Sequence, residues 1–360
     1  MSAESKSRKI IGGEFELCHL PPRNHDDLSV LTHKITGTWT LSGRSALYLV
    51  LKELKEEGIN HIHLPSYLCE SILLVIRSMG FKYDFYPVDM NLCAYPDPPI
   101  GSAVLLIHYF GKVNPATEAL RAEAGKSFYL IEDASQALLS DWSKNFNNSQ
   151  YIILSPRKFG PVILGGWCNL PLKNDDANDR VEKVAWQSLA ARLIKGQYLK
   201  NDSANIEQQT ENFYLESLKE VERFLDENPI CTYLPAWTKQ LIAGYDWGST
   251  SEKRRGNFQL LKKMLSQHVD MLFSEIASKE IPLGFVVRLK KRDWIRMKMA
   301  EARIFCPVHW HLPHDVSKQK FPNSHDLSNT VLTIPIDQRY NSTDMEKIAV
   351  TLKHLLKHGN

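Results

Sequence analysis

The sequence predicts an α/β protein, with a mostly parallel sheet in a large domain and a small α+β domain at its carboxyl end. Short apolar runs alternate with helical segments over the first half of the chain, an order that is typical of right-handed crossovers between parallel strands. A helix-rich stretch follows over residues 177–275, and strands return after residue 280. We therefore expect a large domain over residues 1–245, which includes an amino-terminal arm, and a small domain over residues 246–360.

The composition is that of a globular chain that can bury a large core. Of its 360 residues, 43% are hydrophobic and 24% are charged, and the net charge of +3 is too small to indicate a nucleic-acid partner or an anionic membrane. No apolar segment follows the basic residues near the start, and no run reaches the roughly 18 apolar residues of a membrane span. The six cysteines are scattered without a Cys-x-x-Cys pair, which indicates reduced thiols in a cytoplasmic protein.

Apolar spacing and turn residues locate the elements of the first half. Residues 1–30 are polar and predict an extended arm or edge. Apolar residues recur at helical spacing after Ser42 and Ser45, either of which can cap the helix, and Gly58 ends it. Further along, we expect helices over 66–79 and 115–124, and strands over 59–64, 83–88, 103–107, 128–131 and 151–154.

The second half begins with a change of composition after the glycine pair at positions 165 and 166. A short basic run, Lys253-Arg254-Arg255, lies within one of the predicted helices, and we interpret it as a solvated helix face in preference to a binding patch. Residues 201–210 form a polar linker. The predicted strands are 167–172, 283–289, 304–308 and 331–336, and the predicted helices are 181–199, 213–225, 251–276, 291–302 and 343–357.

The strands expected at 128–131 and 151–154 each place reactive side chains at their carboxyl ends. Asp133 and Gln136 follow the first, and Ser155 and Lys158 follow the second. Ligands of open α/β sheets bind outside these strand ends. A lysine that forms a Schiff base and a carboxylate that keeps a pyridine nitrogen protonated are what pyridoxal phosphate (PLP) chemistry requires. On spacing alone, a surface lysine near an aspartate is the commoner explanation, because this pair is a weak motif.

A second candidate site lies where the first long helix begins. Free backbone N–H groups and the positive end of a helix dipole bind anions, and Gly43, Arg44 and Ser45 stand at this position. A plain capped helix is the commoner explanation for so short a motif. The strand expected at 103–107 ends in His108, for which a structural role is more frequent than a catalytic one.

The residues around these candidates resemble one enzyme family. The segments Glu-Asp-Ala-Ser-Gln-Ala over 132–137 and Ser-Pro-Arg-Lys-Phe-Gly over 155–160, followed by Gly-Gly-Trp, are similar to those of the DegT/StrS-type sugar aminotransferases, a branch of the fold-type I PLP-dependent enzymes. The segments 43–47, 307–310 and 332–340 add to the likeness, which extends from about residue 36 to 357. The resemblance implies the fold-type I architecture.

The resemblance also implies a role for each residue near the predicted strand ends. Lys158 would bind PLP covalently and then act as general acid and base, Asp133 would pair with the pyridinium nitrogen, and Gln136 would lie near the ring hydroxyl. Ser155 would bind the phosphate. Because Lys158 follows Ser155 by only three positions, Arg157 is expected to share the phosphate.

Other positions match the family in part. The backbone of 43–45 would supply donors to the phosphate, and His108 begins a His-x-x-Gly turn that relatives often have. Tyr67 is the candidate for the aromatic ring that covers the pyridine by offset stacking. Cys69 stands where many relatives have that aromatic residue, so a core position for Tyr67 stays open.

The function implied by the resemblance is amino transfer from an amino acid to a nucleotide-linked keto sugar, in surface-polysaccharide or secondary-metabolite biosynthesis, by a homodimer. Two alternatives stay open: a non-catalytic fold-type I scaffold, and dehydration or elimination at the same lysine. The histidines at 309, 311, 314 and 325 suggest a metal, but no cysteine or carboxylate is spaced to complete a set, so we expect no metal. Gly-x-Gly-x-x-Gly, P-loop and Gly-x-Ser-x-Gly patterns do not occur.

Overall fold

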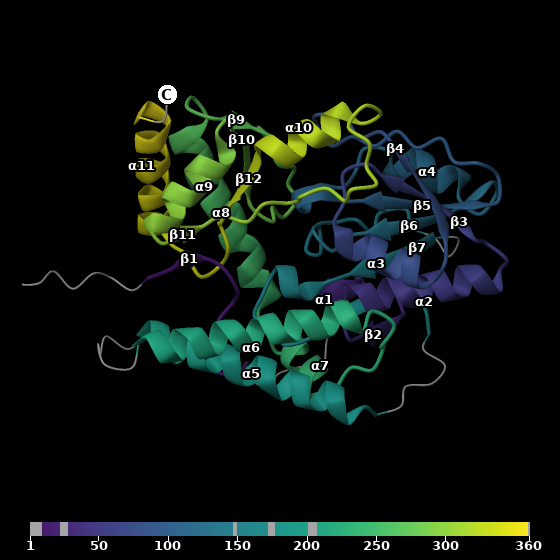
Figure 1. Cartoon of the computed structure of the whole chain (residues 1–360), viewed down its shortest axis with the longest axis horizontal. Coiled ribbons are helices and arrows are strands. Elements are labelled where there is room, and N and C mark those ends of the chain that lie inside the picture. Colours follow the sequence, from purple (N-terminus) through teal and green to yellow (C-terminus); the bar gives the residue numbers. More distant parts are fainter. Residues whose placement is uncertain (1–8, 22–27, 147–149, 172–176, 201–206, 359–360) are drawn as a thin grey trace, which may run out of the picture.

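The structure is a computed structural model that describes residues 9–21, 28–146, 150–171, 177–200 and 207–358. Within these residues the largest layer is a seven-stranded sheet in the order β2-β8-β7-β6-β5-β3-β4 (Figure 1). Neighbouring strands from β4 to β7 pair in parallel, whereas β8 pairs antiparallel with both β7 and β2. The predicted mostly parallel sheet is therefore confirmed. Its strands are β2 (Thr38–Thr40), β3 (His61–Pro65), β4 (Lys82–Tyr86), β5 (Ser102–Ile107), β6 (Phe128–Asp133), β7 (Gln150–Leu154) and β8 (Gly166–Cys168).

Helices α2 (Gly43–Glu56), α3 (Glu70–Ser78) and α4 (Thr117–Glu123) connect these strands. The apolar stripe predicted for α2 is buried against the sheet. The side chain of Ser42 caps α2 by accepting a hydrogen bond from the N–H of Ser45 at 3.3 Å. The helix ends before Gly58, whose φ of +81° is favourable for glycine. Since α2 contacts β7 and β8, its beginning lies near the carboxyl end of β7.

The helical stretch in the middle of the chain contains four helices among the described residues. Helices α5 (Asp179–Lys200) and α6 (Glu207–Glu227) pack against each other along their length (Figure 1). They are followed by α7 (Ala236–Ala243) and α8 (Trp247–Leu265). Residues 201–206 of the predicted linker and residue 172 of a predicted strand lie outside the described residues. The remainder of that predicted linker belongs to α6, which begins six residues before the predicted start.

The helix predicted over 251–276 is shorter than expected. Helix α8 ends at Leu265, and the chain forms the strand β9 (Asp270–Met271). Met271 lies opposite Val287 of the antiparallel strand β10 (Phe285–Arg288). The N–H of Leu272 donates to the carbonyl of Val286 at 2.9 Å, so this short stretch joins the sheet where a helix was predicted.

A three-stranded sheet in the order β12-β10-β9 forms the centre of the carboxyl-terminal part. Strand β11 (Ile304–Phe305) stops before Pro307 and β12 (Val331–Ile334) stops before Pro335, so both are shorter than predicted, since proline has no N–H for a ladder. The predicted helices 291–302 and 343–357 are confirmed as α9 (Arg292–Glu301) and α11 (Ser342–His358). Helix α10 (Pro322–Thr330) was not predicted.

The amino-terminal arm joins this carboxyl-terminal part. Strand β1 (Ile11–Gly12) pairs in parallel with β11, and Ile11 is fully buried in the core between α8, α9, α11 and the three-stranded sheet. A short helix, α1 (Ser29–Thr32), follows the arm and was not predicted. The predicted domain boundary falls between α7 and α8 and stays a prediction. Ile11 of the arm packs in the carboxyl-terminal core, whereas Leu17 packs in the core of the large sheet and donates its N–H to the carbonyl of Arg192 on α5 at 3.0 Å.

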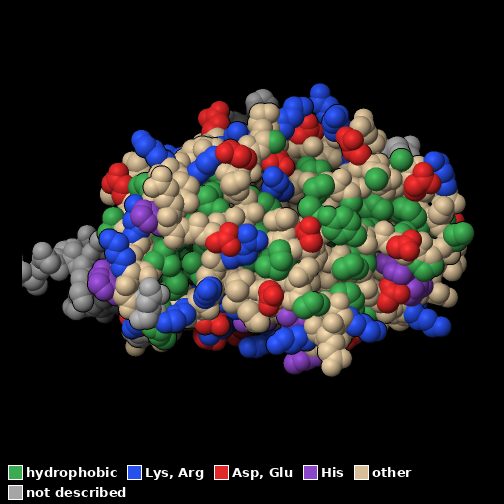
Figure 2. All heavy atoms as spheres, turned by 90° about the horizontal axis from the view of Figure 1, so that it is seen from above, with side chains coloured by type: hydrophobic (Ala, Val, Ile, Leu, Met, Phe, Trp, Pro, Cys, Tyr) green, Lys and Arg blue, Asp and Glu red, His purple; other side chains and the backbone are tan. Residues whose placement is uncertain are grey.

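The surface matches the small net charge. Basic and acidic side chains are interspersed, with apolar side chains between them, on the face seen from above (Figure 2). Among the residues that the structure describes, none of the helices is both long enough and apolar enough to span a membrane.

Candidate active site

A cavity of about 540 Å³ lies outside the carboxyl ends of β6 and β7. Asp133 lines it from the end of β6, and Ser155 and Lys158 line it after β7. These positions are close because Asp133 pairs with Ile153 in the parallel ladder. The structure thus brings the predicted carboxylate and amine to one cavity.

Asp133 is buried and has one of its two carboxylate oxygens engaged. Oδ1 accepts a hydrogen bond from the N–H of Ser135 at 2.8 Å, which orients the carboxylate. Oδ2 has no hydrogen-bond partner among the described residues. The site therefore offers a fixed carboxylate with an oxygen available for a protonated ring nitrogen.

Lys158 ends a short 3-10 turn over Pro156–Lys158. Its Nζ has no hydrogen-bond or ion-pair partner among the described residues, although the side chain lines the cavity. His309 lies on another wall, where burial and, secondarily, the charge of Lys158 lower its pKa to about 3. His309 is therefore neutral at ordinary pH and does not compete with Lys158 for a negative group.

The beginning of α2 forms the wall beside Ser155. Gly43 and Arg44 line the cavity, and a Cβ atom built on Gly43 would lie 3.3 Å from Cβ and 3.7 Å from Oγ of Ser155. Ser45 is fully buried, and its N–H is used by the cap of Ser42. The first backbone N–H groups of α2 and the hydroxyl of Ser155 consequently face one region, as the binding of an anion requires.

Two arginines border this anion region, and both already have acidic partners on α6. Arg157 pairs with Glu222, and Nη2 of Arg44 lies 2.6 Å from Oδ1 of Asp226. The Nε atoms of both arginines are buried and have no hydrogen-bond partner within the described part of the chain. Burial lowers the pKa of Arg157 to about 10, so the guanidinium stays charged at neutral pH. These unsatisfied donors fit a phosphate, whereas Glu222, which also lines the cavity, opposes one.

Gln136 lies behind the cavity wall and does not line it. Its Oε1 accepts a hydrogen bond from the N–H of Phe110 at 2.9 Å. Its Nε2 is buried without a partner among the described residues. A buried amide donor of this kind is costly unless a ligand or water satisfies it, so Gln136 stays a candidate for a group at the back of the site.

His108 lies in a buried ionic network away from the cavity lining. Its Nε2 is 2.9 Å from Glu132, and its Nδ1 accepts a hydrogen bond from the N–H of Asn114 at 3.1 Å. Arg121 donates to both carboxylate oxygens of Glu132, at 2.7 and 2.8 Å. All these contacts join β5, β6 and α4, which is the arrangement of a structural histidine.

Tyr67 is fully buried and does not line the cavity. Its hydroxyl donates to the backbone carbonyl of His309, and its ring lies beside those of Tyr109 and Trp310, with centroids 5.8 and 5.5 Å away. Cys69 lines the cavity instead. Of the two roles that the sequence left open for Tyr67, the structure favours a position in the core.

Arg254 is a site residue that the sequence analysis missed, and its assignment to a solvated helix face was wrong. It is 1% exposed, it lines the cavity, and it donates to the carbonyls of Leu283 and Phe159 at 2.9 and 3.2 Å. Gln338 also donates to the Phe159 carbonyl, at 2.8 Å. Because Phe159 follows Lys158 directly, these contacts hold the turn that presents the lysine. Burial lowers the pKa of Arg254 to about 10.

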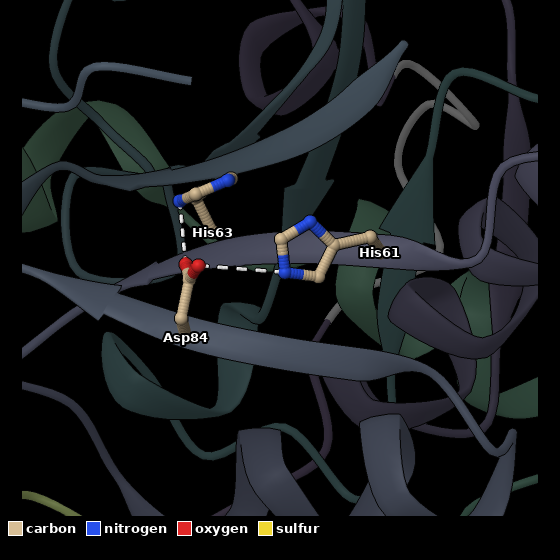
Figure 3. Close-up of side chains that lie close together, drawn as sticks. All are labelled: His61, His63 and Asp84. Atoms are coloured by element: carbon tan, nitrogen blue, oxygen red, sulfur yellow. Dashed lines mark ion pairs between the residues drawn. The ribbon is translucent and has the colours of Figure 1, made fainter. Parts of the chain in front are cut away.

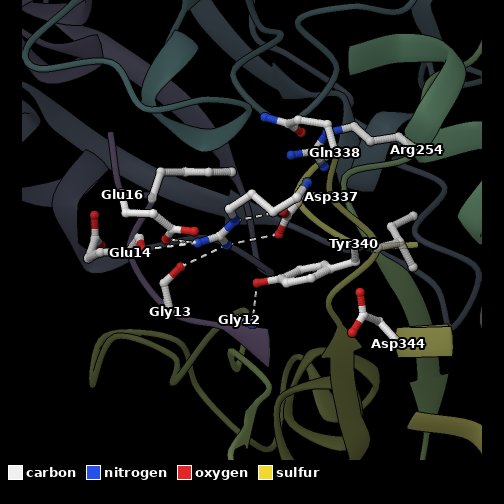
Figure 4. Close-up of polar contacts among 12 residues, drawn as sticks. Gly12, Gly13, Glu14, Glu16, Arg254, Asp337, Gln338, Tyr340 and Asp344 are labelled. Atoms are coloured by element: carbon white, nitrogen blue, oxygen red, sulfur yellow. Dashed lines mark hydrogen bonds and ion pairs between the residues drawn. The ribbon is translucent and has the colours of Figure 1, made fainter. Parts of the chain in front are cut away.

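The amino-terminal arm closes the cavity together with the segment after β12. Arg339 pairs with Asp337 at 2.7 Å and with Glu16 at 2.8 Å, and it donates to the carbonyl of Gly13 at 3.2 Å. The N–H of Gly12 donates to the hydroxyl of Tyr340 at 2.6 Å. Figure 4 shows the two segments side by side, with the carboxylates of Glu16 and Asp337 on either side of the guanidinium that pairs with both. The resemblance had singled out the second segment, but the pairing with the arm was not predicted.

No protein-family model and no curated protein matches the sequence. Solved structures match most of it. A Streptococcus pneumoniae protein described as a sugar aminotransferase, in its PLP form, is 14% identical with a TM-score of 0.64, over 96% of this chain and 93% of that one. A DegT DnrJ EryC1 StrS aminotransferase from Brucella abortus is 14% identical with a TM-score of 0.55, over 90% of this chain and 86% of that one. DesI, solved in the presence of its TDP-sugar product, is 14% identical with a TM-score of 0.61, over 92% of this chain and 83% of that one. The expected fold-type I architecture is confirmed.

Proposed function

We propose that this chain, which has the fold of the DegT/StrS-type sugar aminotransferases, is a PLP-dependent aminotransferase that acts on a nucleotide-linked keto sugar. The observation that supports this most is the cavity shared by Lys158 and Asp133, in which the amine has no hydrogen-bond or ion-pair partner among the described residues. The structural neighbours include a protein in its PLP form and one with a TDP-sugar product. An amino acid is the expected amino donor.

Each residue of the cavity has its own role in the proposed reaction. When bound, PLP supplies an electron sink that allows a proton to leave the substrate carbon. Lys158 holds the cofactor through Nζ and moves that proton as general acid and base. Asp133 holds the pyridine nitrogen protonated, and Ser155 with the backbone of Gly43 and Arg44 binds the phosphate. Arg254 keeps the turn of Lys158 in place.

The first experiment compares the visible absorption of two lysine variants. Purified, PLP-supplemented protein is expected to show a visible band, which Lys158→Met is expected to weaken strongly because Nζ of Lys158 would form the covalent bond to the cofactor. Lys126→Met is the matched control, since Lys126 is an exposed lysine paired only with Glu123 in the described structure. A band of equal strength in Lys158→Met would refute the assignment.

The second experiment measures amino transfer. The protein is incubated with glutamate and a panel of nucleotide-linked keto sugars, and formation of the amino sugar is followed by mass spectrometry. Asp133→Asn is expected to retain the visible band and to lose most of the turnover, because a neutral amide does not keep the ring nitrogen protonated. Loss of the substrate hydroxyl without amino transfer would instead indicate elimination chemistry at Lys158.

A non-catalytic scaffold is the second candidate, and one observation favours it. Arg44 and Arg157 are paired with Asp226 and Glu222, so the proposed phosphate region is partly neutralised from within the chain. A scaffold would show no visible band at saturating PLP. The band and its dependence on Lys158 therefore separate the two candidates.

We also propose that the protein acts as a homodimer in the cytoplasm. Helices α5 and α6 expose large apolar side chains, with Trp186 and Phe213 more than half exposed, which supports an interface between two copies. All six cysteines are free thiols, which supports a reducing compartment. Sedimentation equilibrium tests the dimer, and charged substitutions at Trp186 and Phe213 are expected to shift it toward monomer.

A further inference from the structure

Two histidines and an aspartate come together on the outer strands of the large sheet, away from the candidate active site. His61 and His63 are two positions apart on β3, so their side chains share one face of the strand. Asp84 lies on the edge strand β4, directly opposite His63 in the parallel ladder. Figure 3 shows its carboxylate between the two imidazoles.

The distances suit a metal ion after small side-chain rotations. Nδ1 of His63 is 2.5 Å from Oδ1 of Asp84, and Nε2 of His61 is 3.4 Å from Oδ2 of the same carboxylate. One ligand atom from each of the three residues lies within 4.8 Å of the others. Ligand atoms around a tetrahedral Zn²⁺ are about 3.4 Å apart, given metal–ligand distances of about 2.1 Å.

The surroundings favour a bound cation that keeps access to solvent. The His63 side chain is 9% exposed, whereas those of His61 and Asp84 are 30% and 52% exposed, so water can complete the coordination. Nε2 of His63 is buried without a hydrogen-bond partner among the described residues.

We propose that His61, His63 and Asp84 form a binding site for a divalent transition-metal ion, with Zn²⁺ as the ion that fits best. Two imidazole nitrogens and one carboxylate oxygen are a common donor set for zinc, and water supplies the fourth ligand. The ion joins the edge strand β4 to β3 and neutralises the Asp84 carboxylate, whose ion-pair partners within the described part of the chain are the two imidazoles.

This site is separate from the proposed aminotransferase chemistry. The metal ligands lie before the carboxyl end of β3, whereas the cavity is lined by Cys69, Ser71 and Ile72, which follow that strand. The sequence signal was His61-x-His63 within a predicted strand. Asp84 joins this pair through the register of β3 against β4, which the sequence alone does not give.

The test measures zinc bound by the full chain after treatment with a chelator. Because the rings of His354 and His358 on α11 lie 4.5 Å apart and could also bind zinc, the reference protein is the His354→Asn/His358→Asn variant. This reference protein is expected to bind one zinc ion per chain in equilibrium dialysis. Adding His61→Asn or Asp84→Asn is expected to weaken binding at least about tenfold.

Cobalt provides a readout that depends on coordination geometry. Co²⁺ bound to the reference protein is expected to show the visible absorption of a four-coordinate ion, and Asp84→Asn is expected to weaken it. Asp84 is half exposed, so this variant is expected to fold, which circular dichroism checks. Absence of zinc binding in the reference protein, or unchanged binding in both His61→Asn and Asp84→Asn, would overturn the proposal.

Discussion

Gly166 allows β8 to approach the beginning of α2, and a single methyl group there tests the proposed anion site. A Cβ atom at position 166 would lie 2.1 Å from the carbonyl carbon and oxygen of Ser42 and 2.5 Å from N of Gly43. A separation of 3.4 Å is ordinary contact, so the backbone must open by 3.4 − 2.1 = 1.3 Å. The atoms that must move are the cap of α2 and the first N–H group beside Ser155.

Two consequences of Gly166→Ala can be estimated from this geometry. Overpacking against backbone lowers the free energy of unfolding by about 1–3 kcal/mol. Moving the first N–H groups of α2 by about 1 Å removes a hydrogen bond to a charged phosphate, which costs about 1.5–3 kcal/mol, or about 10- to 100-fold in affinity. We therefore expect a moderate loss of stability together with a large loss of affinity for PLP.

Urea denaturation measures the first effect, and titration with PLP measures the second. Gly256→Ala is the matched control, because Gly256 lies in α8 and a Cβ atom there meets no atom within 4 Å. That variant is expected to raise the free energy of unfolding by about 0.5–1 kcal/mol through helix propensity, with unchanged PLP affinity. If Gly166→Ala were as stable as the unmodified chain and bound PLP equally well, the assignment of the anion site to the beginning of α2 would be refuted.

Three further predictions concern charged side chains. Glu132→Gln is expected to cost about 3–5 kcal/mol by leaving Arg121 buried without its carboxylate, measured by urea denaturation. The contacts of Glu132 lower its pKa, so the stability that Glu132 adds to the fold is complete above its ordinary pKa of 4.5 and is lost as the pH falls through the lowered value. The free energy of unfolding of Glu132→Gln should therefore fall less steeply in acid than that of the unmodified chain. Arg254→Met is expected to lower the free energy of unfolding by about 2–3 kcal/mol, because buried carbonyls lose a charged donor, and an unchanged melting temperature would contradict this. Glu222→Gln is expected to tighten PLP binding about two- to fivefold by releasing Arg157, as titration can show, whereas weaker binding would count against a phosphate beside that arginine.

The sequence predicted six of the seven strands of the large sheet because they are short apolar runs with clear turns, and it missed the three-residue strand β2. Asp133, Ser155 and Lys158 line one cavity because they follow neighbouring parallel strands, and this outcome depends on sheet topology more than on exact boundaries. The carboxyl-terminal strands were predicted too long because apolar residues continue past Pro307 and Pro335, where the ladder cannot.

The positions that were missed depend on contacts between distant segments. Arg254 lies among basic residues, and composition alone suggests solvent. Arg254 does lie on the buried stripe of α8 with Thr250, Phe258 and Leu261. Its helical spacing therefore indicated a buried position, whereas its charge indicated an exposed one. The partners of Arg339 in the arm had no comparable local signal. His108 could not be distinguished from a catalytic histidine because Arg121 and Glu132 become its neighbours only in the folded sheet.

The contacts of Arg339 with the amino-terminal arm also determine when the cavity can be completed. Gly13 and Arg339 are 326 positions apart, so loop-closure entropy opposes their contact until the intervening core has formed. A growing chain on the ribosome that has not yet reached Arg339 contains Lys158 and Asp133 but lacks one wall around them. The pocket for the proposed cofactor is therefore complete only after the last strands and helices have left the ribosome.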